Sequence, residues 1–282
     1  YDGRLLRTLK PINMMIPFIM RTRTDSQNLF EDRIEISAVQ RWIRAQKEAG
    51  AEGELGILHV VIAACVRILA TRPGVNRFVK NGRIYARKDI TISIAIKKTL
   101  DDEGIESTIK LRFDPRDTVY DVRDRIHAAL EENKKPETEN STDRLAAHLV
   151  RLPPCILKGA VAFLDLLDNH GLLPRALNEA SPFHTSMWIT DLGSIGIQSI
   201  YHHIYEFGTT SAFFAFGTRT RETETAEDGT VHTRSYLTLR AVTDERIVDG
   251  YYYAATFRLF RKILMHPEQL ETPPPSIPED ID

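Results

Sequence analysis

The segment from Asp244 to Gly250 reads Asp-Glu-Arg-Ile-Val-Asp-Gly and places two carboxylates, Glu245 and Asp249, four residues apart. Residues alternate in polarity before the segment and have helical spacing after it, so it lies between a strand and a helix. A pair of carboxylates is the machinery of a glycosidase, but that reaction needs a separation matched to a sugar. No other motif in the chain supports that reaction, and we set it aside.

Histidines and cysteines are the other residues whose types could do chemistry. Adjacent side chains point apart in extended structure, which argues against a metal site at His202 and His203, and we predict no metal site. His59 lies in an apolar helical stretch and is expected to be a hydrogen-bonded core residue. Cys65 and Cys155 also lie in apolar stretches and are predicted to be buried thiols, which suits a reducing, cytoplasmic location.

Composition excludes several classes of protein. The 282 residues are 42% hydrophobic and 27% charged, which is typical of a globular protein, and the net charge of −2 provides no electrostatic footprint for nucleic acid or an anionic membrane surface. No secretory leader is recognised. The apolar stretch 152–173 contains Pro153-Pro154 and three charged residues, so we predict an amphipathic packed helix and no transmembrane segment.

The elements that must position the motif follow from periodicity and turn signals. Residues 14–20 are expected to be extended because Pro17 interrupts a helix, and Ser37 with Gln40 is a capping-box start. A polar linker, 134–141, is the best internal boundary. Helices are expected over 37–50, 55–71, 119–130 and 250–264, and strands over 90–96, 109–113, 186–191, 212–217 and 237–241, with a hairpin turn at Asp228-Gly229. The predicted class is α/β or α+β with a mixed sheet.

The motif at 244–250 resembles the Asp-His-Arg-x-x-Asp-Gly signature of the 2-oxoacid dehydrogenase acyltransferase catalytic domain, which shares a fold with chloramphenicol acetyltransferases. Two further stretches agree in order: residues 189–196, like the family's strand and loop before its acyl site, and Arg72 to Asn76, like the end of its long buried helix. The ending 257–270 also has the family's pattern. The resemblance implies an α/β fold of the chloramphenicol acetyltransferase type, with a mixed sheet flanked by helices, over residues 1–270. Residues 271–282 are expected to be a disordered acidic, Pro-rich tail.

Roles for individual residues come from this resemblance. Glu245 stands where the family has its catalytic His, Thr190 is the hydroxyl that would stabilise the oxyanion, and Asp191 is a weaker candidate beside it. Asp249 would be a buried structural carboxylate paired with Arg21 or Arg23, between which the sequence does not choose. Gly250 would permit a tight strand-to-helix turn. His184 either lines the acyl pocket or is a satisfied loop histidine, and the second is favoured.

The function implied is a coenzyme A-dependent acyltransferase that moves an acyl group from a thioester to a thiol, hydroxyl or amine of a small-molecule acceptor. The resemblance also implies a homotrimer with the site between subunits, and no lipoyl domain or peripheral subunit-binding domain is recognised in this sequence. A Glu would need burial to raise its pKa by two or more units before it could serve as this base. The alternatives are an inactive relative that acts as a trimeric assembly protein and a lipid-facing acyltransferase that uses the apolar stretch 152–173.

Overall fold

The larger sheet runs through the middle of the molecule, and the motif begins at the last residue of its longest strand. The structure, a computed structural model, describes residues 2–50, 53–97, 106–134, 150–225 and 228–282. In this part of the chain the strand order is β2-β10-β8-β7-β5-β6, and β9 pairs with β10. The strands are β2 (Gln27–Glu35), β5 (Ile90–Lys97), β6 (Glu106–Phe113), β7 (Met187–Asp191), β8 (Ala212–Phe216), β9 (Thr220–Thr225) and β10 (Val231–Asp244). Strands β5, β7 and β8 are parallel and the other pairs are antiparallel, so the predicted mixed sheet is confirmed.

Helices cover one face of this sheet and form the main core. The helices there are α2 (Ser37–Glu48), α3 (Ile57–Thr71), α4 (Val119–Lys134) and α8 (Gly250–Met265). Helix α3 is apolar on all sides and is buried from His59 to Ala70, as its sequence predicts. A smaller apolar cluster on the opposite face contains Trp188, Ile204, Phe213 and Val242. The helices and strands predicted from periodicity are therefore confirmed in type and order.

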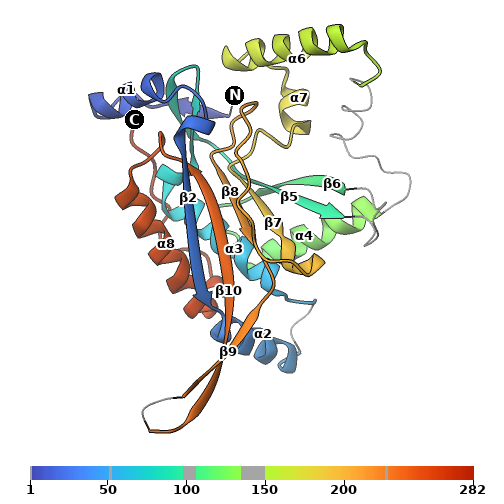
Figure 1. Cartoon of the computed structure of the whole chain (residues 1–282), viewed down its shortest axis with the longest axis vertical. Coiled ribbons are helices and arrows are strands. Elements are labelled where there is room, and N and C mark those ends of the chain that lie inside the picture. The colour runs from blue at the N-terminus through green and yellow to red at the C-terminus, as the bar shows by residue number, and fades with distance from the viewer. Residues whose placement is uncertain (1, 51–52, 98–105, 135–149, 226–227) are drawn as a thin grey trace.

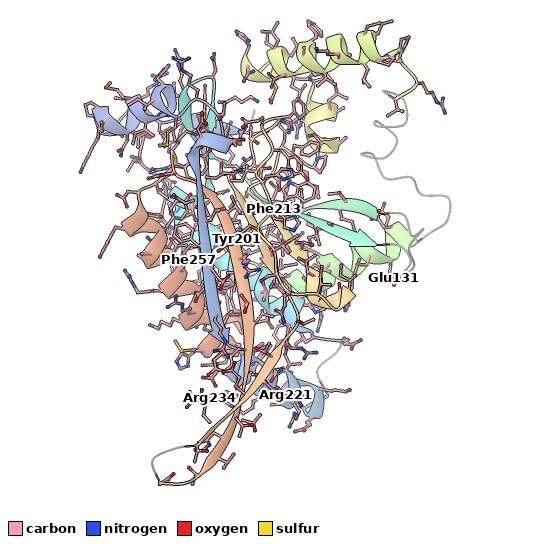
Figure 2. The ribbon with its side chains drawn as sticks, in the orientation of Figure 1. Glu131, Tyr201, Phe213, Arg221, Arg234 and Phe257 are labelled. Atoms are coloured by element: carbon pink, nitrogen blue, oxygen red, sulfur yellow. The ribbon has the colours of Figure 1, made fainter. Side chains whose placement is uncertain are left out.

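The two ends of the molecule differ in character. Figure 1 shows α1 (Pro11–Ile19) and α6 (Pro154–Asn169) at one end, with the β9–β10 hairpin projecting from the other. The predicted turn in that hairpin is confirmed, and Gly229 adopts a φ of 83° there. Figure 2 shows Arg221 and Arg234 on its two strands.

A second, three-stranded sheet lies near both termini, in the order β1-β4-β3. Its strands are β1 (Gly3–Leu5), β3 (Arg77–Lys80) and β4 (Arg83–Arg87). The C-terminal segment reaches this sheet, where Asp280 pairs with Arg77 at 2.5 Å and Asp282 pairs with Arg4 at 2.7 Å. The expected disorder of residues 271–282 is therefore wrong, because ion pairs hold this proline-rich segment in an extended path.

Two local predictions in the first fifth of the chain are corrected. Residues 11–19 form a helix with Pro17 inside it, since Pro11 occupies its first turn and the helix ends two residues after Pro17. Helix α2 does begin at Ser37, but the hydroxyl of Ser37 accepts a hydrogen bond from the backbone N–H of Ser235 at 3.1 Å. The strand neighbour therefore uses the hydroxyl that a capping box would have needed.

Helix α6 lies in the apolar stretch 152–173 but is not packed as predicted. Only Asp168 is buried along it, and exposed apolar residues include Ile156, Val161 and Phe163. Cys155 at its start is likewise exposed, whereas Cys65 is buried. No helix in the described ranges is long and apolar enough to cross a membrane. The predicted linker, 134–141, lies almost wholly outside the described residues. The remaining short helix nearby is α7 (Arg175–Ala180).

Candidate active site

A buried ion pair organises the motif at the end of β10. The guanidinium of Arg246 donates from Nε to Asp244 Oδ1 at 2.8 Å and from Nη2 to Asp244 Oδ2 at 2.6 Å. Their side chains are only 3% and 0% exposed. The hydroxyl of Tyr253 on α8 donates to the backbone carbonyl of Asp244 at 2.7 Å. These hydrogen bonds therefore connect the end of β10 to the helix that follows it.

Glu245 lies between these two buried residues in sequence and is exposed. Its backbone N–H donates to the carbonyl of Ser26 at 2.8 Å, which fixes its position. Its side chain is exposed and has no hydrogen-bond or ion-pair partner among the described residues. The burial that a Glu base requires is therefore not provided within a single chain.

Asp249 has a different role from the one carried over by resemblance. It is exposed, and its carboxylate caps α8 by accepting the backbone N–H of Tyr252 at 2.8 Å. The predicted pair with Arg21 or Arg23 is wrong. Arg21 is exposed, and the buried guanidinium of Arg23 donates to backbone carbonyls of residues 79, 206, 208 and 210. Burial lowers the pKa of Arg23.

Glycines in the family-like segments differ in how far the fold needs them. Gly250 begins α8 without a left-handed φ, and a Cβ there would meet nothing within 4 Å, so the expected requirement for glycine at this turn is wrong. Gly74 does have a steric reason. A Cβ there would lie 2.8 Å from the ring of Tyr252 and 2.9 Å from Val248, so glycine lets the end of α3 approach the motif closely.

Thr190 lies two strands across the sheet from β10 and well back along it from Glu245. It pairs with Ala215 on β8, and Ala215 pairs with Arg240 on β10, five residues before Glu245. At about 3.4 Å per strand residue, this register separates the two positions by roughly 17 Å along β10. The structure therefore does not bring these two predicted site residues together within one chain.

The surroundings of Thr190 suit a hydrogen-bond donor. The residue is 7% exposed, and its hydroxyl has no partner among the described residues. Asp191 follows it and accepts the backbone N–H of Ser194 at 3.1 Å, and burial raises the pKa of Asp191. A cavity of about 570 Å³ opens beside Asp191, lined also by Arg219 and the start of α3.

His184 belongs to a separate buried cluster. Its ring is 0% exposed, with Nδ1 2.8 Å from the hydroxyl of Ser181 and Nε2 3.1 Å from Asp168 Oδ1. The other oxygen of Asp168 pairs with Lys80. Burial alone would raise the pKa of Asp168, but the bonds to His184 and Lys80 outweigh it and lower that pKa. These contacts are those of a buried, hydrogen-bonded loop histidine, and the cluster joins the end of α6 to the body of the protein.

His59 is a hydrogen-bonded core residue, as its sequence context predicts. His59 is 8% exposed, and its Nδ1 accepts the backbone N–H of Gly56 at 2.9 Å. No group of three or more potential metal ligands occurs within the described ranges.

Known acyltransferases resemble this chain in sequence and in fold. The family model described as 2-oxoacid dehydrogenases acyltransferase (catalytic domain) matches residues 176–272, which contain Thr190, Glu245 and Asp249. The predicted resemblance is confirmed. The match covers about a third of the chain, from α7 to just beyond α8, and leaves the segment Arg72 to Asn76 outside it. No curated protein sequence matches the chain.

Solved acyltransferases share the fold across nearly the whole chain. A probable dihydrolipoamide acetyltransferase from Listeria monocytogenes has a TM-score of 0.58 at 14% identity and covers 95% of this chain and 96% of its own. The dihydrolipoamide acetyltransferase of Azotobacter vinelandii has a TM-score of 0.60 at 13% identity, with 96% and 93% covered. A chloramphenicol acetyltransferase has a TM-score of 0.55 at 12% identity, with 93% and 99% covered. The predicted chloramphenicol acetyltransferase-like fold is therefore confirmed.

Sequence reasoning missed the importance of two motif residues. Asp244 and Arg246 were quoted as part of the signature, but their spacing of two gave no sign of a pair. Asp244 is the last residue of β10 and Arg246 lies in the turn after it, so strand alternation does not relate them and the pair becomes visible only in the structure.

Proposed function

We propose that the chain is a coenzyme A-dependent acyltransferase domain that works as a homotrimer. Each active site would combine Glu245 of one subunit with Thr190 of another. The observation that carries this proposal is the separation of these residues by two strands and about five strand positions, in a chain whose fold is that of acyltransferases. Because the two groups cannot meet within one chain, a site that uses both needs two chains.

The chemistry would divide between the two residues as follows. Glu245 takes the proton of an acceptor thiol, and the sulfur attacks the carbonyl carbon of the acyl thioester. The hydroxyl of Thr190 donates to the negatively charged oxygen of the tetrahedral intermediate. The intermediate then expels the thiolate of coenzyme A, which recovers a proton from Glu245. The donor thus leaves as a free thiol, and the acyl group ends on the acceptor.

A neighbouring subunit would also provide the burial that Glu245 lacks. The carboxylate of a Glu with a pKa of about 4.3 is a weak base toward a thiol with a pKa of about 8.5. Burial or a nearby like charge raises the pKa of a Glu. In the Azotobacter enzyme, which was investigated for a Ser, a His and an Asn in its mechanism, the His and the Asn are four positions apart. Glu245 and Asp249 have the same spacing, which supports their alignment with that His and Asn. Glu245 then stands where the Azotobacter enzyme has a His.

One observation favours a second function, that of an inactive trimeric assembly protein. Asp244, Arg246 and Asp249 all hold the end of β10 and the start of α8 in place. Selection for folding alone would retain these three residues, even if Glu245 did no chemistry. The assembly function therefore differs from the enzyme only in what Glu245 and Thr190 do.

Release of free thiol from a panel of acyl-coenzyme A donors, with small thiol and amine acceptors, tests the proposal. We expect activity above background in the wild type and a loss of about 10²–10⁴-fold in Glu245→Gln. Glu48→Gln, at an exposed carboxylate at the end of α2, is the matched control and should keep full activity. Equal background rates in all three proteins, with a trimer mass by light scattering, would favour the assembly function. A monomer mass would contradict both.

A further inference from the structure

A groove between α1 and α6 is a cavity to which the proposed function gives no role. It has a volume of about 1050 Å³, at the upper end of the range for small-molecule sites. Its walls come from α1, from α6 and from the turn between β3 and β4. Figure 1 shows these helices at the same end of the molecule. Arg246, directly after Glu245, also lines the groove.

Apolar side chains line the two helical walls. Phe18 of α1 is 63% exposed and Val161 of α6 is 46% exposed, although both line the same groove. Phe207 adds an aromatic ring from the segment before β8. Water-exposed apolar side chains on two sides of one cavity would release free energy if a hydrocarbon chain lay between them.

The groove also has an excess of positive charge. Five cationic side chains and two carboxylates line it. Lys80 and Arg246 are already paired with Asp168 and Asp244, so the cations that remain to face Asp165 and Glu206 are Arg21, Arg23 and Lys158. Glu206 is already engaged, since its oxygens accept the backbone N–H groups of residues 23 and 24 at 3.1 and 2.9 Å. Arg23 adds a buried charge that binds only carbonyl oxygens through its guanidinium. The side chains of Arg21 and Lys158 have no ion-pair partner among the described residues.

Arg21 lies at the motif end of the groove. The guanidinium of Arg246 reaches the backbone carbonyls of residues 20 and 21 at 3.3 Å, which places it beside Arg21. An anionic head group at the exposed side chain of Arg21 would leave its chain free to lie along Phe18 and Val161. We propose that this groove binds a single-chain amphiphilic anion, with a carboxylate or phosphate at Arg21 and a hydrocarbon chain between α1 and α6.

The shape favours a dissolved ligand over a membrane surface. A bilayer meets a protein on one outward face, whereas here residues of two helices bound a common volume. The buried pair of Asp168 with Lys80 holds the end of α6 against the β3–β4 turn, so the groove has a fixed floor. The proposal does not depend on acyl transfer, because it concerns binding alone.

Calorimetric titration of the wild-type protein with saturated fatty carboxylates of 8 to 14 carbons, below their micelle concentrations, tests the proposal. We expect saturable binding with one site per chain, tightening with each added methylene by about four-fold at most. Alkyl phosphates of equal chain length should bind comparably, and the uncharged alcohols at least ten-fold more weakly.

Two variants with matched controls locate the site. Val161→Asp and Arg21→Gln should each weaken binding at least ten-fold. Val231→Asp, on the distant hairpin, and Arg44→Gln, on α2, should leave it unchanged, since both control positions are exposed and outside the groove. The proposal fails if no saturable binding occurs, if all four variants behave alike, or if only anionic lipid vesicles bind. A change in oligomer mass in Val161→Asp would also overturn it, because the groove would then be a subunit contact.

Discussion

Arg246 holds Asp244 through two parallel hydrogen bonds of 2.8 and 2.6 Å, and both side chains are almost completely buried. Glu245 lies between them in sequence and is exposed. The pair therefore fixes the backbone on both sides of the residue that replaces the family's His. A catalytic group positioned by a rigid pair, or a surface residue left over from one, would show the same arrangement.

The first prediction concerns the stability contributed by this pair. Asp244→Ala leaves the guanidinium of Arg246 buried without its carboxylate, which should lower the free energy of unfolding by roughly 3–5 kcal/mol. Urea denaturation followed by circular dichroism measures the change. A loss below about 1 kcal/mol would show that water or another carboxylate takes over the role of Asp244.

Asp249 provides the contrasting case. Its carboxylate is an exposed helix cap, so Asp249→Ala should cost about 0.5–2 kcal/mol, well below Asp244→Ala. Asp249→Ser, which can also accept the N–H of Tyr252, should recover most of that loss. A cost as large as that of Asp244→Ala, with no recovery in the Ser variant, would instead indicate the buried arginine pair implied by family resemblance.

His59 predicts a pH dependence of stability. Burial, together with the nearby His127 and Arg123, lowers its pKa from 6.5 to about 4 in the folded protein. Between these values the unfolded chain binds a proton that the folded chain does not, so stability falls as the pH is lowered from 6.5 toward 4. The expected loss is up to about 3 kcal/mol.

Comparison of two histidine variants isolates this effect. His59→Gln should flatten the decline in unfolding free energy between pH 6.5 and 4, while His170→Gln, at an exposed histidine, should leave the slope as in the wild type. Identical slopes in all three proteins would mean that His59 titrates in the folded state as it does in the unfolded chain.

Periodicity in the sequence predicted most of the fold because burial enforces it. Ile90, Ile92 and Ile94 alternate with polar residues and form the predicted strand β5, paired with β6. The uniform apolar character of α3 likewise reflects its position under the sheet. These patterns are local, and one buried face is enough to produce them.

Features that depend on a distant partner could not be predicted. The hydroxyl of Ser37 accepts a hydrogen bond from Ser235, and the guanidinium of Arg23 donates to carbonyls of two distant segments. No local sequence pattern indicates such partners. The exposure of α6 was missed for a related reason, because an apolar stretch indicates burial without saying which molecule provides it. The sequence indicated the motif and Thr190 as candidates for the site, but their separation could be seen only from the strand register.

Complementation between two inactive variants tests the central claim most directly. Chains carrying Glu245→Gln and chains carrying Thr190→Val are each expected to be inactive in thiol release from an acyl-coenzyme A donor. In mixed trimers, some interfaces pair an intact Glu245 with an intact Thr190, and random mixing of equal amounts gives about a quarter of the sites in this state. We therefore predict that co-expressed, mixed protein recovers about a quarter of wild-type activity. Mixed trimers no more active than either variant alone would contradict a site shared between subunits.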